Sequence, residues 1–236
     1  MKGVIKDCTG VILAGGENRR MPVLKGFIEV EGKKIIERTL KIMKKLFREI
    51  FIITNQPELY SYLRVPMLGD VYTVRGPMTG VLTALINSSD NWIFVSACDM
   101  PFINPDVIRF MARERYNPTC ITIINGGQGV APDTISTTDI YDTVVPLSAY
   151  KAEPLFAFYS KKIMSSLDQF VLTGKKSIKY FLLNHDKRVK YITSDELKNI
   201  DPELRSFINL NTPEDIELHL SDGDKLKYQQ RLLIRN

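Results

Sequence analysis

The stretch Trp92-Ile93-Phe94-Val95-Ser96-Ala97-Cys98 is almost continuously apolar, as expected of a strand buried on both faces of a parallel sheet. Similar apolar runs precede it at 11–13 and 50–54. Between these runs, apolar residues recur at helical spacing over 34–48, and a second apolar helical stretch covers 76–86. Strand and helix therefore alternate with a period of about 30 to 40 residues, which predicts an α/β fold with a Rossmann-like, doubly wound, mostly parallel sheet.

The size and charge of the chain limit the class of protein. Its 236 residues predict a single domain over 1–220, followed by a basic C-terminal tail over 221–236. With 44% hydrophobic and 25% charged residues, the composition is that of a globular protein and excludes disordered and fibrous classes. The 32 Lys and Arg residues exceed the 27 Asp and Glu residues, giving a net charge of +5. This excess suits anionic ligands such as phosphates without indicating a nucleic-acid partner.

The sequence also predicts a location and a redox state. No segment approaches the roughly 18 consecutive apolar residues that a membrane span requires, and charges interrupt the first residues, 1–7, where a signal peptide would be apolar. The chain has three cysteines, Cys8, Cys98 and Cys120, whose number and spacing fit reduced thiols. We therefore expect a cytoplasmic protein with no membrane partner. No base accompanies Cys98 or Cys120, so we interpret both as buried small residues.

The second half of the chain is less regular. Residues 117–142 are rich in Gly, Ser and Thr, which predicts a loop or flap around a short strand at 120–124. This segment fits either a functional lid or a plain insertion. Paired strands are expected at 144–146 and 155–159, and a last short strand or its exit at 207–211.

Helices and basic clusters complete this half. The pattern predicts helices over 163–172 and 177–183, and a capped helix start at 212–215. Two basic clusters fit either a solvated surface or an anion site: Lys175, Lys176 and Lys179, and Lys187, Arg188 and Lys190.

Candidate ligand-binding residues follow the predicted strands, because ligands of open α/β sheets bind beyond the carboxyl ends of the strands. Gly15 and Gly16 follow the first strand, and Arg19, Arg20 and Lys25 come next. Glycine lets backbone N–H groups approach a ligand closely, and Arg and Lys neutralise phosphate charge. The segment matches neither the Walker pattern nor G-x-G-x-x-G, so it fits either a plain turn or a phosphate-binding loop.

Carboxylates and amides follow three other segments. Asp99 comes directly after the most apolar strand, where it would either hold Mg²⁺ on a nucleotide or cap a helix. Asp70 precedes the helix start at 76–80 and is a candidate wall for a nucleotide base. Asn209 and Asn211 offer amide oxygens for a metal or phosphate shell, although a turn or cap would also use them.

These segments together resemble one family. The matching motifs, in order, are Val11-Ile12-Leu13-Ala14-Gly15-Gly16 with Arg20-Met21 and Lys25, Gly76-Pro77-Met78-Thr79-Gly80, Cys98-Asp99-Met100-Pro101, Glu153-Pro154-Leu155-Phe156-Ala157-Phe158-Tyr159, and Asn209-Leu210-Asn211-Thr212-Pro213-Glu214-Asp215. This order is similar to that of the molybdenum cofactor guanylyltransferases, which are MobA-like nucleotidyltransferases with a three-layer, Rossmann-like domain. The first motif alone would indicate only the wider nucleotidyltransferase superfamily.

The resemblance implies a reaction and a set of site residues. GTP and the molybdopterin form of the molybdenum cofactor would give the guanine dinucleotide cofactor and pyrophosphate, with Mg²⁺ required. The implied nucleotide-binding residues are Leu13, Gly15, Gly16, Lys25, Asn55, Asp70 and Asp99. Lys25, Arg20 and Asp99 would be catalytic, with Asp99 as the metal ligand, and Asn209 and Asn211 would lie near the pterin phosphate or the metal. Molybdoenzyme apoproteins or their chaperones would receive the product.

The residues themselves agree with this chemistry. The attacking phosphate oxygen is already ionised at neutral pH, so no strong general base is needed, and the presence of only two histidines, His185 and His219, is compatible. Positioning and charge stabilisation by Mg²⁺, Lys25 and Arg20 would carry the catalysis.

Two departures from the family keep other functions open. Pro22 and Leu24 stand where the family usually has Gly and Asp, and proline has a fixed φ and no N–H. The alternatives are a cytidylyltransferase for the same cofactor, a sugar-nucleotide pyrophosphorylase and a non-catalytic nucleotide-binding regulator. By analogy with the family, Gly16 and Cys98 favour guanine over cytosine. Release of pyrophosphate would separate an enzyme from a regulator.

Overall fold

The computed structural model describes residues 3–15, 21, 23–116, 141–148, 151–175, 177–184 and 188–234, and it confirms the α/β fold. Within these residues the main sheet has eight strands, in the order β10-β7-β9-β6-β1-β4-β5, with β8 paired to β7. The strands are β1 (Cys8–Leu13), β4 (Ile50–Ile53), β5 (Met67–Leu68), β6 (Trp92–Ala97), β7 (Thr143–Ser148), β8 (Lys151–Ala152), β9 (Phe156–Ser160) and β10 (Val189–Ile192). β1 is parallel to β4 and β6, whereas β9 is antiparallel to β6 and β7. The sheet is therefore mixed but mostly parallel.

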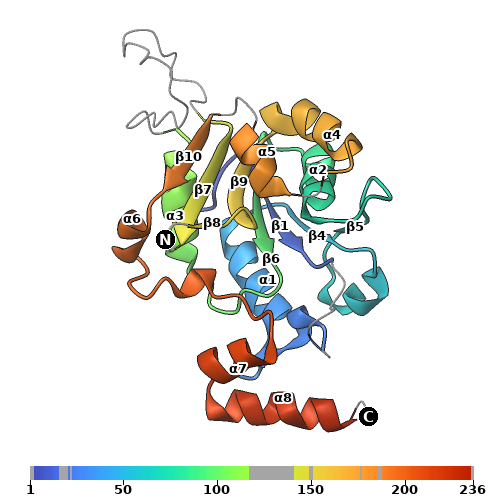
Figure 1. Cartoon of the computed structure of the whole chain (residues 1–236), viewed down its shortest axis with the longest axis vertical. Coiled ribbons are helices and arrows are strands. Elements are labelled where there is room, and N and C mark those ends of the chain that lie inside the picture. Colours follow the sequence, from blue (N-terminus) through green and yellow to red (C-terminus); the bar gives the residue numbers. More distant parts are fainter. Residues whose placement is uncertain are drawn as a thin grey trace.

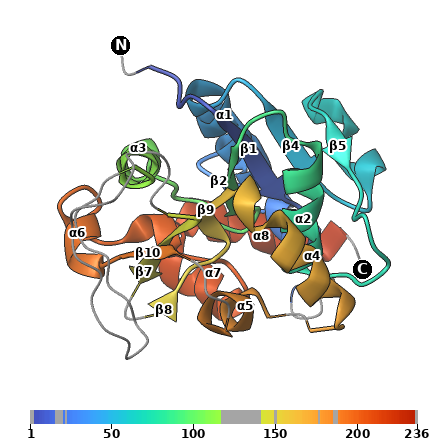
Figure 2. The ribbon, with the colours of Figure 1, turned by 90° about the horizontal axis from the view of Figure 1, so that it is seen from above.

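Helices cover both faces of the sheet, because consecutive strand residues point to opposite faces. On β1, Ile12 belongs to the hydrophobic cluster of α1 (Ile35–Leu46) and α3 (Pro105–Glu114). Its neighbour Val11 belongs to the cluster of α2 (Pro77–Asn87), α4 (Met164–Leu172) and α5 (Ile178–Asn184). Figure 2 shows α1 and α3 on one side of the strands and α4 and α5 on the other. This three-layer arrangement explains why the central strand β6 is apolar on both faces.

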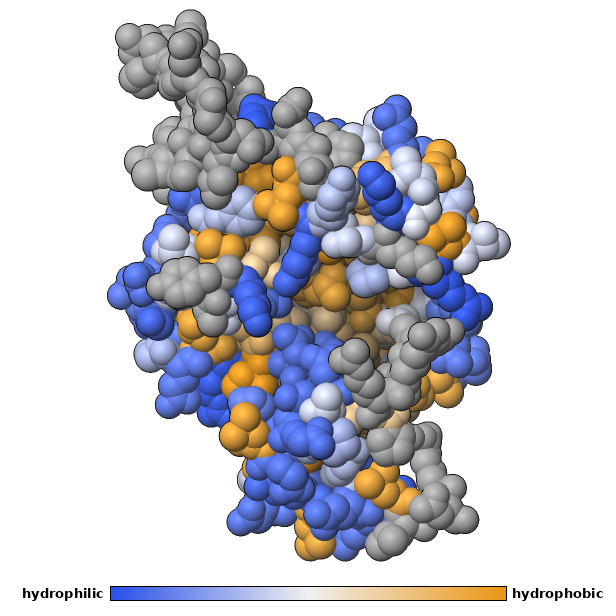
Figure 3. Space-filling model, viewed as in Figure 1, coloured by the Kyte–Doolittle hydropathy of each residue, from blue (hydrophilic) through white to orange (hydrophobic). Residues whose placement is uncertain are grey.

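A third, smaller hydrophobic cluster joins the C-terminal helices to an early hairpin. The hairpin consists of β2 (Glu29–Val30) and β3 (Lys33–Lys34), and the helices are α7 (Pro213–His219) and α8 (Asp222–Ile234). The buried members of the cluster are Met21, Val23, Ile28, Val30, Ile35, Leu210, Ile216, Leu220 and Tyr228. Figure 1 shows α7 and α8 side by side at one end of the molecule, and Figure 3 shows that the surface there is mostly hydrophilic.

Two expectations for the second half of the chain need correction. No strand forms at 207–211, because this segment begins in a 3-10 turn (Arg205–Phe207) and Leu210 N then donates to Asp99 O at 3.0 Å in the loop after β6. Lys190, expected in a surface or anion-binding cluster, lies in β10, which pairs in parallel with β7. Its side chain is buried, with Nζ 3.9 Å from Glu114 Oε2. Strand β10 buries this lysine stem together with its carboxylate partner.

Other expectations agree with the structure or fall outside it. The helices predicted at 34–48, 76–86, 163–172 and 177–183 form as α1, α2, α4 and α5. The strand expected at 120–124 lies outside the described residues, as does the flap except for 141–142. Among the residues that the structure describes, no helix is long and apolar enough to cross a membrane.

Candidate active site

Four parallel strands end level with one another at one edge of the sheet. Their residues in register there are Leu13 of β1, Ile53 of β4, Leu68 of β5 and Ala97 of β6. Four residues expected at the site each lie two positions farther along the chain: Gly15, Asn55, Asp70 and Asp99. Since neighbouring strands are about 4.8 Å apart, this edge spans about 14 Å. Figure 3 shows a hollow with hydrophobic residues at the centre of the face where Figure 1 places the ends of β1 and β6.

A lysine, a carboxylate and an amide meet at this edge. Lys25 Nζ donates hydrogen bonds to Asp99 Oδ2 at 3.1 Å and to Asn211 Oδ1. The partners lie 74 and 186 positions away in sequence, on the loop after β6 and on the segment before α7. Only 23% of the Lys25 side chain and 14% of the Asp99 side chain are exposed. We call Lys25, Asp99 and Asn211 the ammonium cluster.

The start of α7 fixes Asn211 in the ammonium cluster. Asp215 Oδ2 accepts hydrogen bonds from Asn211 N and Thr212 N, both at 2.8 Å, and Thr212 Oγ1 accepts one from Asp215 N. This capping box forms where the sequence predicts it. Asn209 is not brought to the cluster, because its Nδ2 donates to Phe207 O at 3.0 Å. One residue of the expected asparagine pair therefore contacts Lys25, and the other closes a local turn.

A second polar pair lies after β4 and β5. Asn55 Nδ2 donates to Asp70 Oδ2 at 2.8 Å, and Asp70 N donates to Asn55 Oδ1 at 3.0 Å. Helix α2 approaches this pair closely through Gly80, where an added Cβ would lie 3.0 Å from Leu13 Cδ2 and 3.9 Å from Asp70 Oδ1. The Leu13 side chain is buried against α2, while Gly15 is exposed. We call Asn55 and Asp70 the amide–carboxylate pair.

The oxygens of the ammonium cluster fit a magnesium ion. Asp99 Oδ1 is buried and has no hydrogen-bond partner among the described residues, and Asp99 Oδ2 and Asn211 Oδ1 both face the Lys25 cation. Hard oxygen donors of this kind are the ligands that Mg²⁺ prefers, and it commonly takes one or two carboxylates plus substrate phosphates and water. The described residues contain no cluster of three or more His, Cys, Asp or Glu able to hold a metal. The donor set thus suits an ion shared with a nucleotide.

Glu153 is a site neighbour that sequence reasoning did not assign. The antiparallel β6–β9 ladder ends at Ser96 and Phe156, and the chain turns just before β9, where Phe156 N donates to Glu153 O at 3.0 Å. Glu153 lies in this turn, within electrostatic reach of Asp99. Burial raises the pKa of the Glu153 carboxyl above its ordinary value, and the Asp99 charge adds to this rise, while Lys179 and Lys151 oppose it. The sequence shows the motif that contains Glu153, but only the fold brings the turn before β9 near enough to Asp99 for the two charges to interact.

The described cysteines are not placed for nucleophilic chemistry. Cys98 follows β6 and is mostly buried, and burial raises the pKa of its thiol to about 12, with the Asp99 charge adding to the rise. Burial also raises the pKa of Cys8. Cys120 and His185 lie outside the described residues, and His219 lies at the end of α7. A thiol needs its thiolate form to attack, so neither described cysteine is activated.

Part of the expected phosphate loop also falls outside the described residues. Gly16, Arg20 and Pro22 belong to that part. Leu24 has an extended backbone with φ −56° and ψ 123°, and a short 3-10 turn begins at Lys25.

A mostly parallel sheet with cationic and oxygen-donor side chains at its carboxyl edge defines a nucleotide-binding α/β enzyme. The family model of the MobA-like NTP transferase domain matches residues 10–189. The chain therefore belongs to this family, and it is a nucleotidyltransferase, as the sequence resemblance predicts.

Individual relatives cover almost the whole chain. A probable molybdenum cofactor guanylyltransferase from Peptoclostridium acidaminophilum is 31% identical over 88% of this chain and 86% of its own. A molybdenum cofactor guanylyltransferase from Desulfosudis oleivorans is 31% identical over 89% of this chain and 92% of its own. The crystal structure of molybdopterin-guanine dinucleotide biosynthesis protein A from Archaeoglobus fulgidus matches with a TM-score of 0.70 and 25% identity, covering 89% of this chain and 95% of that one.

Proposed function

We propose that this nucleotidyltransferase transfers GMP from GTP to the molybdopterin form of the molybdenum cofactor, with Mg²⁺. The products would be the guanine dinucleotide cofactor and pyrophosphate. The names of the relatives support the two substrates. The observation that carries the proposal is the ammonium cluster, because Lys25, Asp99 and Asn211 come from three separate family motifs and meet at one point. Delivery of the product to molybdoenzyme apoproteins or their chaperones, and a cytoplasmic location, stay predictions.

The transfer forms a bond from an oxygen of the pterin phosphate to the α-phosphorus of GTP. It breaks the bond from that phosphorus to the oxygen bridging to the β-phosphate, so pyrophosphate leaves with this oxygen. The attacking phosphate is ionised at neutral pH, and no side chain has to remove a proton from it. The protein therefore has to align the two phosphates and stabilise the charge that develops between them.

Each part of the sheet edge has a task in this reaction. The Lys25 ammonium and the Gly15 N–H would donate hydrogen bonds to phosphate oxygens. Arg20 and Gly16, which lie outside the described residues, stay predictions for the same role. Asp99 and Asn211 would hold Mg²⁺ through their side-chain oxygens. When bound, the ion supplies positive charge at the phosphates and acts as a Lewis acid.

The amide–carboxylate pair would bind the guanine base. The N1–H and 2-amino groups of guanine are hydrogen-bond donors, which suits the Asp70 carboxylate. Asn55 holds that carboxylate in place through the hydrogen bond at 2.8 Å. The buried Leu13 supports the same end of the site from β1.

A thermal-shift panel with GTP, CTP, ATP and UTP, each with and without Mg²⁺, tests the nucleotide. A ligand present at 100 times its Kd adds about 2.7 kcal/mol to the free energy of unfolding, which raises the Tm by roughly 5 to 10 °C. We expect a Mg²⁺-dependent shift with GTP. A shift with CTP alone would identify a cytidylyltransferase instead. Pyrophosphate release on adding molybdopterin then separates an enzyme from a protein that only binds GTP.

A further inference from the structure

Helix α8 packs on the segment that carries Lys25, beyond the region that the family model matches, residues 10–189. Three residues of α8, at helical positions i, i+4 and i+7, lie on one face: Asp224, Tyr228 and Arg231. Tyr228 is buried in the hydrophobic cluster shared with β2. We call these three residues the α8 contact face.

The two charged residues of this face bind the main chain at the hairpin turn and just before the first strand of the hairpin. Asp224 accepts hydrogen bonds from Glu31 N through Oδ1 at 3.0 Å and through Oδ2 at 3.1 Å. Arg231 Nη1 donates to Phe27 O at 2.5 Å, and its Nη2 pairs with the Glu29 carboxylate. The segment from Phe27 to Glu31, which begins two residues after Lys25, is therefore fixed to α8.

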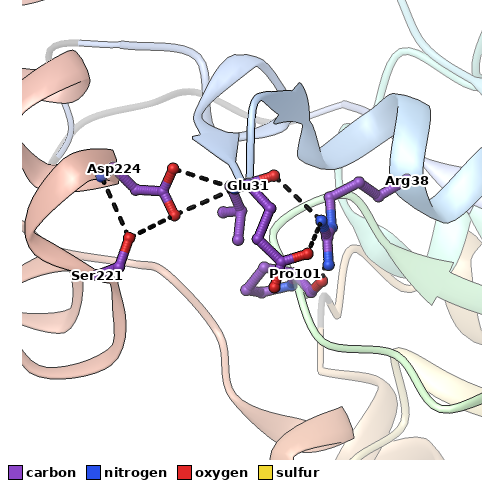
Figure 4. A network of polar contacts seen from close by, with 6 residues as sticks. Glu31, Arg38, Pro101, Ser221 and Asp224 are labelled. Atoms are coloured by element: carbon purple, nitrogen blue, oxygen red, sulfur yellow. Dashed lines mark hydrogen bonds and ion pairs between the residues drawn. The ribbon is translucent and has the colours of Figure 1, made fainter.

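The other side of the hairpin is tied to the loop that carries Asp99. Arg38 of α1 donates from Nη1 to Val30 O at 3.1 Å and to Glu31 Oε2 at 2.8 Å, and from Nε to Pro101 O at 3.4 Å. Figure 4 shows the resulting contacts, with Glu31 between Asp224 and Arg38, and Pro101 below Glu31 beside the Arg38 guanidinium. The hairpin after Lys25 thus lies between α8 and the Asp99 loop.

The hairpin turn needs such support. Glu31 has a φ of 52° and Gly32 a φ of 74°, and the left-handed region is unfavourable for a residue with a side chain. Such a conformation persists where neighbouring groups hold it. Asp224 does so directly by accepting the Glu31 N–H, and Ser221 Oγ orients that carboxylate by donating to its Oδ2 at 2.9 Å.

We propose that α8 positions Lys25 for the transfer reaction, with Asp224 and Arg231 as positioning residues that act through the hairpin. Lys25 lies at the start of the 3-10 turn leading into β2, so the place of the hairpin sets where its ammonium lies relative to Asp99. This inference rests on the proposed function for the role of Lys25 in binding nucleotide. It gives the C-terminal helix a part in the site although α8 contributes no residue to it.

Hydrogen exchange of the nucleotide-free chain tests the structural half of the inference. In Arg231→Met, the amides of residues 25–31 should exchange about tenfold faster, the factor expected from losing a charge-assisted hydrogen bond. Gln229→Met changes an exposed position on the opposite side of the same helix and should leave this exchange unchanged. Arg231→Lys, which keeps a donor, should restore part of the protection. Equal exchange in Arg231→Met and the wild type would overturn the inference.

A double-mutant cycle on GTP–Mg²⁺ affinity tests the link to Lys25. Arg231→Met should weaken binding about tenfold in the wild-type chain, because small displacements of a positioned group cost one to two orders of magnitude. In a Lys25→Met chain, the same change should weaken binding by less than about twofold, since its effect passes through Lys25. An equal loss in both chains would show a merely structural role and overturn the inference.

The two proposals fail in different ways. A wild-type chain that neither binds GTP nor turns it over overturns the proposed function, and the role of α8 in transfer falls with it. The wild-type chain can instead bind GTP while Arg231→Met shows the same hydrogen exchange and the same affinity for GTP. That result overturns only the role of α8.

Discussion

The ammonium cluster and the amide–carboxylate pair lie at the same edge of the sheet but are built differently. Lys25 reaches partners 74 and 186 positions away, whereas Asn55 and Asp70 are 15 positions apart on the loops after adjacent strands. The cluster is mostly buried and charged, while the pair is more open to solvent. With the proposed function, this difference fits a division of work, in which the cluster would stabilise charge in the reaction and the pair would bind and select the base.

The largest effect is expected from removing the Asp99 charge. Asp99→Asn keeps the side-chain shape but weakens the metal site, so turnover should fall by about 10²- to 10³-fold, as for loss of a charge-stabilising group. Steady-state transfer at saturating Mg²⁺ measures this. Asp195→Asn, at an exposed position on α6 (Ser194–Lys198), is the matched control and should keep full turnover. Near-normal turnover of Asp99→Asn would contradict the division of work.

The sequence predicts the residues at the strand ends better than the contacts that Lys25 makes. Apolar runs locate the ends of two strands, and the carboxyl ends of parallel strands share one edge, so the sequence alone places Gly15 and Asp99 together. Asp70 is a candidate from its place before the helix start at 76–80, and Asn55 enters the predicted site only through the family resemblance. The contact between Lys25 and Asn211 is not predictable in this way, because it depends on how the chain returns to the sheet 186 positions later. Local patterns contain no information about such a return.

Other contacts of charged residues cannot be predicted from the sequence, because they depend on which side chains the fold buries. Lys190 suggests a surface cluster by its charge, yet it is buried in β10 because its stem is apolar and Glu114 offers a partner. Helix α8 has a basic and polar sequence, and its contact face becomes apparent only from its partners, the main chain at 27 and 31, the Glu29 carboxylate and the hydrophobic cluster around Tyr228. Glu153 comes within electrostatic reach of Asp99 through the turn before β9, which apolar runs do not specify.

A change in the amide–carboxylate pair should have a smaller effect, and on the KM for GTP rather than on turnover. Asp70→Asn should raise the KM for GTP about tenfold, since a hydrogen bond to a charged group contributes about 1.5 to 3 kcal/mol. The kcat should change by less than about threefold, because the pair binds substrate and transition state alike. Initial rates over a range of GTP concentrations measure both. Adding Asn55→Ala to Asp70→Asn should raise the KM for GTP little further, because the two residues act as one unit.

The reverse pattern, a lower kcat with an unchanged KM, would place Asp70 in the chemistry and erase the distinction between the two regions. Measuring the preference for GTP over CTP in both variants makes the test more specific. If the pair selects the base, Asp70→Asn should reduce this preference, whereas Asp99→Asn should leave it as it is.

The ammonium cluster makes a further prediction about metal binding without nucleotide. The Lys25 cation faces the oxygens that would hold Mg²⁺, and a unit charge and a divalent ion 4 Å apart repel by about 2 kcal/mol in water, of which salt screening leaves roughly half. Lys25→Met should therefore bind Mn²⁺ about fivefold more tightly than the wild type, as measured by electron paramagnetic resonance of the free ion. Asp99→Asn should bind it more weakly. Weaker binding in Lys25→Met would contradict the shared site.

The smallest effect on turnover is expected from changing Cys98, which is next to Asp99 in sequence but belongs to neither the ammonium cluster nor the amide–carboxylate pair. Its thiol pKa of about 12 leaves only about one thiolate in ten thousand at pH 8. Alkylation of the folded chain at this residue should be slow at pH 8 and rise about tenfold per pH unit up to pH 11, with the denatured chain as the fast control. Cys98→Ala should keep turnover within about twofold. Loss of transfer in this variant would instead indicate a covalent nucleotidyl–cysteine intermediate, and the ammonium cluster would then assist a nucleophile rather than carry the reaction by itself.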